Sequence, residues 1–268
     1  MNQGSAYGRF RELHERSGAF LMPNVWDGGS ALVMAAAGFE ALASSSVAFA
    51  ATLGLDDYAE AIGRDVSVAH AGLLARISGL PVNGDLAEGY GPRPEDCVAT
   101  VEASIAAGLA GLGIEDFSRD PTAPIFGFDE AVRRIEAAAR AAKGRILLTA
   151  RTDNYLHGRR DLDDTIRRLV AFAEAGADVL YAPGLPDMES IRAVVRAVAP
   201  KPVNVVVGPG VSLQALSETG VRRVSLGGSL YRKALGALNE AAQALKAGDI
   251  PAAVAGAFPG AELARLIG

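Results

Sequence analysis

Cysteine, lysine and histidine are scarce in this chain, and each shortage removes a class of chemistry. The only cysteine, Cys97, cannot form an intramolecular disulfide or a cysteine-based metal cluster, and it favours a reducing compartment. We expect it to pack in the core. None of the four lysines follows a strand-like apolar run, so a Schiff-base mechanism is disfavoured. The three histidines are too scattered for a zinc triad, and we expect His157 in a surface loop.

Long apolar runs and an excess of positive charge are also lacking. No segment approaches the roughly 18 consecutive apolar residues of a membrane span, and the first twenty residues lack the uncharged apolar stretch of a signal peptide. The 26 basic residues are outnumbered by 31 acidic ones, which argues against nucleic acid as the main partner. We therefore expect a cytoplasmic protein without a membrane or nucleic-acid partner.

A repeating unit runs through the 268 residues: a short apolar run, a polar or glycine-rich corner, then an amphipathic stretch. Eight such units without a long linker predict an α/β fold, a (β/α)8 barrel, as a single domain over residues 1–268. A doubly wound open sheet is the alternative. Extra helices are expected at residues 1–18 and 231–268. The predicted strands are Phe20–Val25, Ala41–Ser45, Pro81–Asp85, Gly111–Glu115, Ile146–Arg151, Val179–Pro183, Val203–Val207 and Arg223–Gly227.

Carboxylates follow the third and fourth apolar runs, as Asp85, Glu88, Glu115 and Asp116. Active sites of such barrels lie at the C-terminal strand ends. Acids that converge there repel one another unless they are protonated or bound to a cation. Oxygen ligands select a hard ion, and Mg²⁺ is the expected one. For Asp85 with Glu115 we favour a metal site, and for Asp116 we favour a cap on the following helix.

Two corners are suited to an anionic ligand. Arg151 ends the fifth run, where its guanidinium could hold a carboxylate or phosphonate bidentately. The alternative is that Arg151 pairs with Asp153 or Glu115. The run Ser44–Ser46 ends the second strand and offers hydroxyls and backbone N–H groups to a carboxylate or oxyanion.

Six phrases at these corners occur in the order found in one enzyme family. The chain resembles the isocitrate lyase/phosphoenolpyruvate mutase superfamily from about Pro23 to Leu238. The resemblance implies a Mg²⁺-dependent barrel, with Mn²⁺ as an alternative ion, that acts on a small 2-oxo or 2-hydroxy carboxylate. It also implies a homotetramer with a terminal helix swapped between neighbours, which would come from residues 231–268. The phrases are PNVWDGGSA, TLGLDD, GDLAEGYG, GIED, ARTDNYL and PVNVVVGPG.

The same resemblance implies roles for individual residues. Asp85 matches the acid that ligates Mg²⁺ directly, whereas Asp57 and Glu115 match acids that contact the ion through water. Arg151 matches the arginine that binds the substrate's anionic group. Ser44, Ser45 and Ser46 fall where the family binds the oxo-acid carboxylate, and Asn204, at the seventh strand, is assigned to the same substrate. Asp57, Glu115 and Arg151 are the predicted catalytic residues.

Three departures from the family pattern bear on the chemistry. Ala87 stands where the family has a second motif aspartate, and we expect Glu88, one position later, to reach the hydrated ion instead. The stretch 118–124 contains neither the cysteine nor the lysine of the lyases' gating loop. Pro183 stands where those lyases place a glutamate.

These features leave several functions open. The first is a lyase that cleaves a C–C bond next to the enolate of an oxaloacetate-like or alkylmalate/isocitrate-like acid. The second breaks a C–P bond, as a phosphonomutase or phosphonopyruvate hydrolase. The third is a catalytically silent oxo-acid-binding protein. A sugar-phosphate isomerase or aldolase, favoured only by the glycine corners at 208–210 and 227–229, leaves the acids unexplained.

Overall fold

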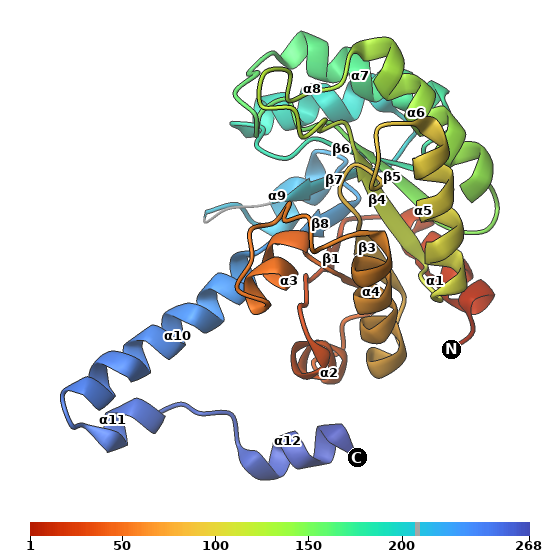
Figure 1. The fold of residues 1–268 in the computed structure, drawn as a ribbon. Coiled ribbons are helices and arrows are strands. Elements are labelled where there is room, and N and C mark those ends of the chain that lie inside the picture. Colours follow the sequence, from red (N-terminus) through yellow and green to blue (C-terminus); the bar gives the residue numbers. More distant parts are fainter. Residues whose placement is uncertain (207–209) are drawn as a thin grey trace.

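A computed structural model describes residues 1–206 and 210–268 of the chain (Figure 1). It contains eight parallel strands in the order β1-β8-β7-β6-β5-β4-β3-β2. Val207, expected to end the seventh strand, lies outside the described residues, as do Gly208 and Pro209 of one predicted glycine corner. The strands are β1 (Phe20–Met22), β2 (Leu42–Ala43), β3 (Val82–Asp85), β4 (Gly111–Glu115), β5 (Leu147–Arg151), β6 (Val179–Tyr181), β7 (Val203–Val206) and β8 (Arg223–Ser225).

The two ends of the sheet meet, which distinguishes a barrel from an open sheet. Asn24 and Ala43 form a parallel bridge between the segments that carry β1 and β2. The Val25 N–H donates to the Ala43 carbonyl at 2.8 Å, and the Ala43 N–H donates to the Pro23 carbonyl at 3.0 Å. The predicted (β/α)8 barrel is therefore confirmed, and the doubly wound alternative is wrong.

Helices alternate with the strands and surround them (Figure 1). They occupy the amphipathic stretches that the sequence predicted between the apolar runs. The short helix α3, which begins inside the serine corner, was not foreseen. The helices are α1 (Gln3–Glu15), α2 (Gly28–Ala36), α3 (Ser46–Thr52), α4 (Arg64–Ser78), α5 (Pro94–Ala106), α6 (Phe128–Ala142), α7 (Leu162–Glu174), α8 (Met188–Val198), α9 (Leu213–Glu218), α10 (Ser229–Lys246), α11 (Ile250–Val254) and α12 (Gly260–Ile267).

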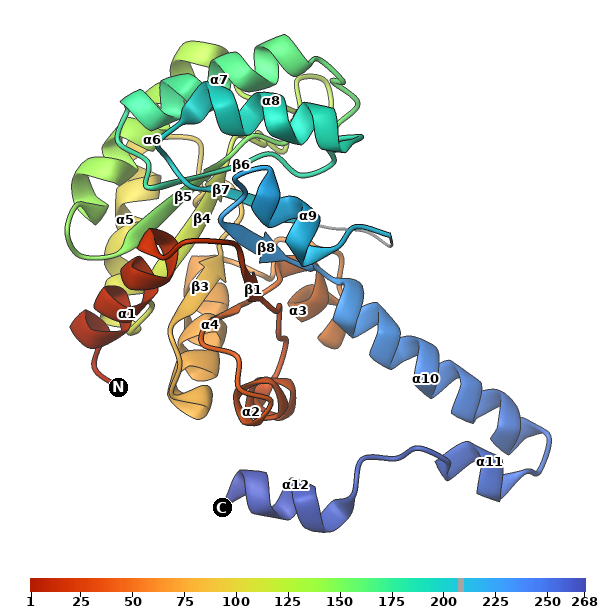
Figure 2. The ribbon, with the colours of Figure 1, turned by 180° about the vertical axis from the view of Figure 1, so that it is seen from behind.

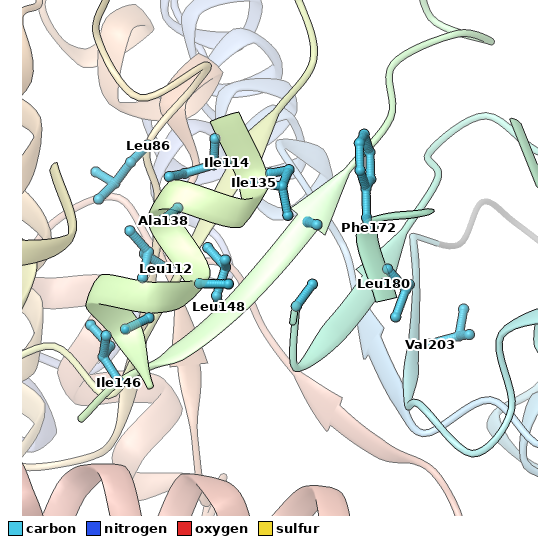
Figure 3. Packing of buried hydrophobic residues seen from close by; sticks show 14 of the residues in the cluster. Leu86, Leu112, Ile114, Ile135, Ala138, Ile146, Leu148, Phe172, Leu180 and Val203 are labelled. Carbon is cyan, nitrogen blue, oxygen red and sulfur yellow. The ribbon is translucent and has the colours of Figure 1, made fainter. Parts of the chain in front are cut away.

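The core lies between the strands and the surrounding helices. Leu112 and Leu148 point from β4 and β5 toward Ile135 of α6, and all three are almost completely buried (Figure 3). Burial of each such side chain contributes roughly 1.5–3 kcal/mol to the hydrophobic free energy of folding. Cys97 belongs to the same cluster, as expected.

The N-terminal helix α1 packs against the ends of the strands opposite to the acidic corners. Phe10 and Leu13 are buried together with Met22 and Leu147. Gly111 permits this approach, because a Cβ there would lie 2.7 Å from a ring carbon of Phe10. The helix thereby seals the barrel from below.

The C-terminal helices form an arm that leaves the barrel. Helix α10 projects from it, and α12 lies back toward α2 (Figures 1 and 2). None of the three arm helices has a buried residue. Within the described part of the chain, no helix has the length and apolar character needed to cross a membrane.

Candidate functional site

Three charged side chains meet where β3, β4 and β5 end. Adjacent strands pair Asp85 with Gly113 and Glu115 with Arg151, so the register brings the three charged residues to one edge. The Arg151 Nη1 atom lies 3.0 Å from Glu115 Oε2 and 3.6 Å from Asp85 Oδ1. The convergence predicted from the sequence is therefore present.

Arg151 is surrounded by acids on several sides. Its Nη2 also donates to Asp153 Oδ2 at 2.8 Å, and its guanidinium carbon lies 5.5 Å from the centre of the Tyr181 ring. Burial alone would lower the pKa of Arg151, but the charges of Asp153, Glu115 and Asp85 hold that pKa well above its usual value. Both pairings that the sequence left open, with Asp153 and with Glu115, occur. An incoming anion must compete with these carboxylates.

Asp57 lies in the loop after α3 and carries an unpartnered buried oxygen. Its Oδ1 atom has no hydrogen-bond partner in the described structure. Burial, followed by the negative charge of Asp85, raises the pKa of Asp57 to about 6. A cation between the two carboxylates would satisfy the free oxygen and remove the repulsion.

The donor set fits a hydrated divalent cation. Asp57 and Asp85 line the same cavity. Mg²⁺ usually keeps several waters and uses one or two protein carboxylates, which matches this pair. Among the residues described, no cluster of three or more His, Cys, Asp or Glu side chains is arranged around an ion. The residues could therefore hold a water-rich Mg²⁺, and they do not form a closed protein cage.

The serine corner orients Asp85. The Ser46 N–H and hydroxyl donate to Asp85 Oδ2 at 2.9 and 3.1 Å. The Asp85 N–H in turn donates to the Ser44 hydroxyl at 2.8 Å, and Ser45 caps α3. All three serines line the cavity. In this structure their polar groups hold the carboxylate and begin the short helix.

Glu115 is held by a residue that the sequence analysis did not single out. The Tyr58 hydroxyl donates to Glu115 Oε1 at 2.8 Å. Burial raises the pKa of Glu115 well above its usual value, although the positive charge of Arg151 opposes the shift. The only sequence signal for Tyr58 is its position directly after Asp57, the last residue of the phrase TLGLDD.

Glu88 is buried near the C-terminal strand ends, and its partner is Arg119 and not Arg151. Its Oε2 accepts from Arg119 Nε at 2.8 Å. Arg119 lies 5.3 Å from the Tyr58 ring centre and 5.9 Å from that of Tyr90. Glu88 and Arg119 line a neighbouring recess and are not among the side chains that line the cavity of Asp57 and Asp85.

Asp116 has a structural role, although it does not cap a helix. Its oxygens accept from the Asp153 N–H at 2.9 Å and from the Thr152 hydroxyl at 2.8 Å, and Arg168 lies 3.1 Å away. Burial raises the pKa of Asp116 to about 6. The residue fixes the loop that presents Asp153 to Arg151.

The cavity at the mouth has a volume of about 710 Å³ and extends into the barrel. Asn204 lines its deeper part and donates to Ser225 Oγ at 3.0 Å. His157 reaches the rim and stacks on Phe117 with ring centres 4.1 Å apart, so it is more than the surface loop residue expected. The corner Gly227–Ser229 also lines the cavity.

A barrel with acids, serines and an arginine at the C-terminal strand ends defines a (β/α)8-barrel enzyme. The sequence model of the family described as phosphoenolpyruvate phosphomutase matches residues 10–246. The chain belongs to this family, within the phosphoenolpyruvate mutase/isocitrate lyase superfamily of lyases and mutases.

Individual relatives agree with this assignment. Oxaloacetate decarboxylase of Paraburkholderia xenovorans is 30% identical, covering 90% of this chain and 83% of its own. A Burkholderia cenocepacia structure provisionally described as a lyase/mutase is 46% identical with a TM-score of 0.94, covering 98% of this chain and 95% of its own. Another from the same organism, provisionally described as a phosphonomutase, is 39% identical with a TM-score of 0.81, covering 92% and 99%.

Proposed function

We propose that the protein is a Mg²⁺-dependent lyase that cleaves a C–C bond next to the enolate of a 2-oxo or 2-hydroxy (di)carboxylic acid. Oxaloacetate-like and alkylmalate/isocitrate-like acids are the candidate substrates. The observation that carries the proposal is the unpartnered Oδ1 of Asp57 beside Asp85 in the cavity. When bound there, Mg²⁺, or Mn²⁺ in its place, would stabilise the enolate charge that develops as the bond breaks.

The protein's own groups divide the remaining work. Asp85 ligates the ion, and Asp57 and Glu115 order its waters. Glu88 is the further candidate for this ordering, and it reaches the ion only when its pair with Arg119 opens. Arg151 anchors the leaving portion of the substrate by exchanging one of its carboxylate partners for the ligand.

The remaining substrate contacts come from the serine corner and from β7. Ser44, Ser45 and Ser46 line the cavity beside Asp85, where they would contact the oxo-acid carboxylate. Asn204 lines the deeper cavity and would contact the rest of the substrate.

A second candidate is a phosphonomutase or phosphonopyruvate hydrolase, because one structural relative carries that provisional description. Turnover of oxaloacetate, dimethylmalate, methylisocitrate and phosphonopyruvate, each with Mg²⁺, Mn²⁺ or EDTA, separates the two. We expect metal-dependent cleavage of a C–C substrate. Turnover of phosphonopyruvate alone would select the second candidate, and binding without turnover would indicate a silent binding protein.

We further propose that the protein is a cytoplasmic homotetramer in which the arm, residues 231–268, packs on a neighbouring subunit. The arm exposes large apolar side chains, including Leu238 at 65%, Ile250 at 64% and Ile267 at 69%. Exposed apolar surface of this kind marks an interaction site. The single buried cysteine favours a reducing compartment.

A further inference from the structure

The floor of the active-site cavity carries a second arginine that the proposed mechanism does not use. Arg223, the first residue of β8, is 1% exposed and lines the same cavity as Asp85 and Arg151. Beneath it lie Phe10 and His14 of α1, which close the barrel from below. The cavity is therefore the side from which a ligand can approach this guanidinium.

The partners of Arg223 are all neutral. Its Nε donates to Asn204 Oδ1 and its Nη2 to Thr149 Oγ1, both at 2.9 Å. Its Nη1 lies 3.4 Å from Nε2 of His14. Burial, followed by the charge of Arg223, lowers the pKa of His14 to about 3, so the imidazole carries no charge at neutral pH. Across residues 1–206 and 210–268, no carboxylate forms an ion pair with Arg223.

A buried cation without a counter-charge is costly, because desolvation is not offset by attraction to an opposite charge. Burial lowers the pKa of Arg223 to about 9. Arg151 differs, since Asp153, Glu115 and Asp85 already neutralise it. Three arginines line the cavity, and Arg232 lies at an exposed position of α10. Of the other two, Arg151 has carboxylate partners, whereas no described carboxylate compensates the charge of Arg223.

Arg223 keeps hydrogen-bond donors for an anion. A guanidinium has five N–H donors, and the three bonds above leave two of them free.

We propose that the cavity floor is a binding subsite for a carboxylate-sized monoanion, with Arg223 as its charge. The occupant is either the second carboxylate of the substrate or a small free anion such as formate or bicarbonate. This subsite rests on the proposed function, because it belongs to the same cavity. One end of a dianionic ligand would lie at Asp57 and Asp85, and its other end would reach Arg223.

The test is calorimetric titration of wild type, Arg223→Gln and Arg223→Lys with Mg²⁺ present. The probes are pyruvate, malonate, succinate, formate and bicarbonate. Arg192→Gln, at an exposed position of α8, is the matched control. If the substrate's second carboxylate occupies the floor, Arg223→Gln weakens a dicarboxylate at least tenfold, leaves pyruvate unchanged, and is partly rescued by Arg223→Lys. If a free anion occupies it, formate or bicarbonate binding is lost instead.

A second measurement uses only the wild-type protein, so it does not depend on whether a variant folds. Wild-type crystals soaked in bromide should show anomalous density beside Arg223. Unchanged binding of every probe in Arg223→Gln, together with no bromide at the floor, would overturn the subsite. The metal site is judged separately by Asp85→Ala. If Asp85→Ala abolishes Mg²⁺-dependent binding and Arg223→Gln changes nothing, the subsite fails while the proposed function stands.

Discussion

The hydroxyl of Tyr58 and the carboxylate of Glu115 form a 2.8 Å hydrogen bond that joins the loop after α3 to the end of β4. Asp57 precedes Tyr58, and Arg151 contacts the other oxygen of Glu115. The bond therefore couples the position of Asp57, a proposed metal residue, to that of Arg151, the arginine proposed to bind the substrate. The guanidinium of Arg119 lies over the same tyrosine ring.

Replacing Tyr58 by phenylalanine removes the donor and leaves a buried carboxylate oxygen unpaired. Loss of one hydrogen bond to a buried charged group costs about 1–3 kcal/mol. If Tyr58 positions Glu115 for the reaction, part of this cost appears in the activation free energy, and a loss of about 1.4 kcal/mol there lowers kcat about tenfold for the substrate found in the panel. Steady-state kinetics checks this, with Tyr7→Phe on α1 as the control. An unchanged kcat would show that Tyr58 does not position Glu115.

Glu88 and Arg119 can be separated by paired variants. Glu88→Gln removes a carboxylate, whereas Arg119→Met breaks the same ion pair and leaves the carboxylate in place. If Glu88 orders water on the ion, the Mg²⁺ concentration for half-maximal activity rises several-fold in Glu88→Gln and does not rise in Arg119→Met. Titration of activity with Mg²⁺ measures both. Equal changes in the two variants would instead assign Glu88 to holding the loop.

The low pKa of the buried His14 imidazole should make the stability of the fold depend on pH. Its Nδ1 donates to the Phe10 carbonyl at 2.8 Å, and its pKa is about 3 in the folded state against 6.5 for the free side chain. Below pH 6.5 the unfolded chain binds a proton that the folded chain does not, so stability falls as the pH drops from 6.5 toward 3.

His14→Gln should remove this contribution, which is of the order of several kcal/mol across the window. Urea unfolding at pH 7.5, 6 and 5 checks it. The free energy of unfolding should fall less steeply with decreasing pH in the variant than in wild type. Parallel curves would contradict the buried neutral imidazole.

The exposed apolar side chains of the arm, residues 231–268, lead us to expect that it packs on another subunit. Leu238→Asp places a charge on a side chain that is 65% exposed in the single chain. If this face is buried in a tetramer, light scattering after size exclusion should show a smaller species. The control Leu73→Asp, on an α4 side chain that is 40% exposed, should leave the mass unchanged. A monomeric wild-type protein would rule out the assembly.

The sequence predicted the ends of β3, β4 and β5 correctly, whereas β1, β2, β6 and β8 end two or three residues earlier than expected. The range Gly111–Glu115 was predicted without error, and Asp85, Glu115 and Arg151 converge because neighbouring parallel strands end at one edge. Arg151 pairs with both Asp153 and Glu115, since a planar guanidinium can contact several carboxylates at once, and its role in binding a substrate anion stays a prediction.

Other features depend on contacts between distant segments and left no local signal. Tyr58 bonds to a residue 57 positions away, and Arg223 meets His14 at a separation of 209. The sequence predicted Ser44, Ser45 and Ser46 at the C-terminal strand ends. It did not predict that this corner orients Asp85 and starts α3, because those contacts depend on the pairing of β2 with β3. Glu88 was expected at the ion, and its bond to Arg119 depends on the loop after β4.

Asp85 and Asp57 are proposed to hold a divalent cation that in turn holds an oxo acid. Thermal unfolding with Mg²⁺ alone, oxalate alone and both together tests it directly in wild type and in Asp85→Ala. We expect a clear rise in Tm for wild type only when both are present, because a ligand at a hundred times its Kd stabilises by about 2.7 kcal/mol. An equal rise with oxalate alone, or the same response in Asp85→Ala, would contradict it.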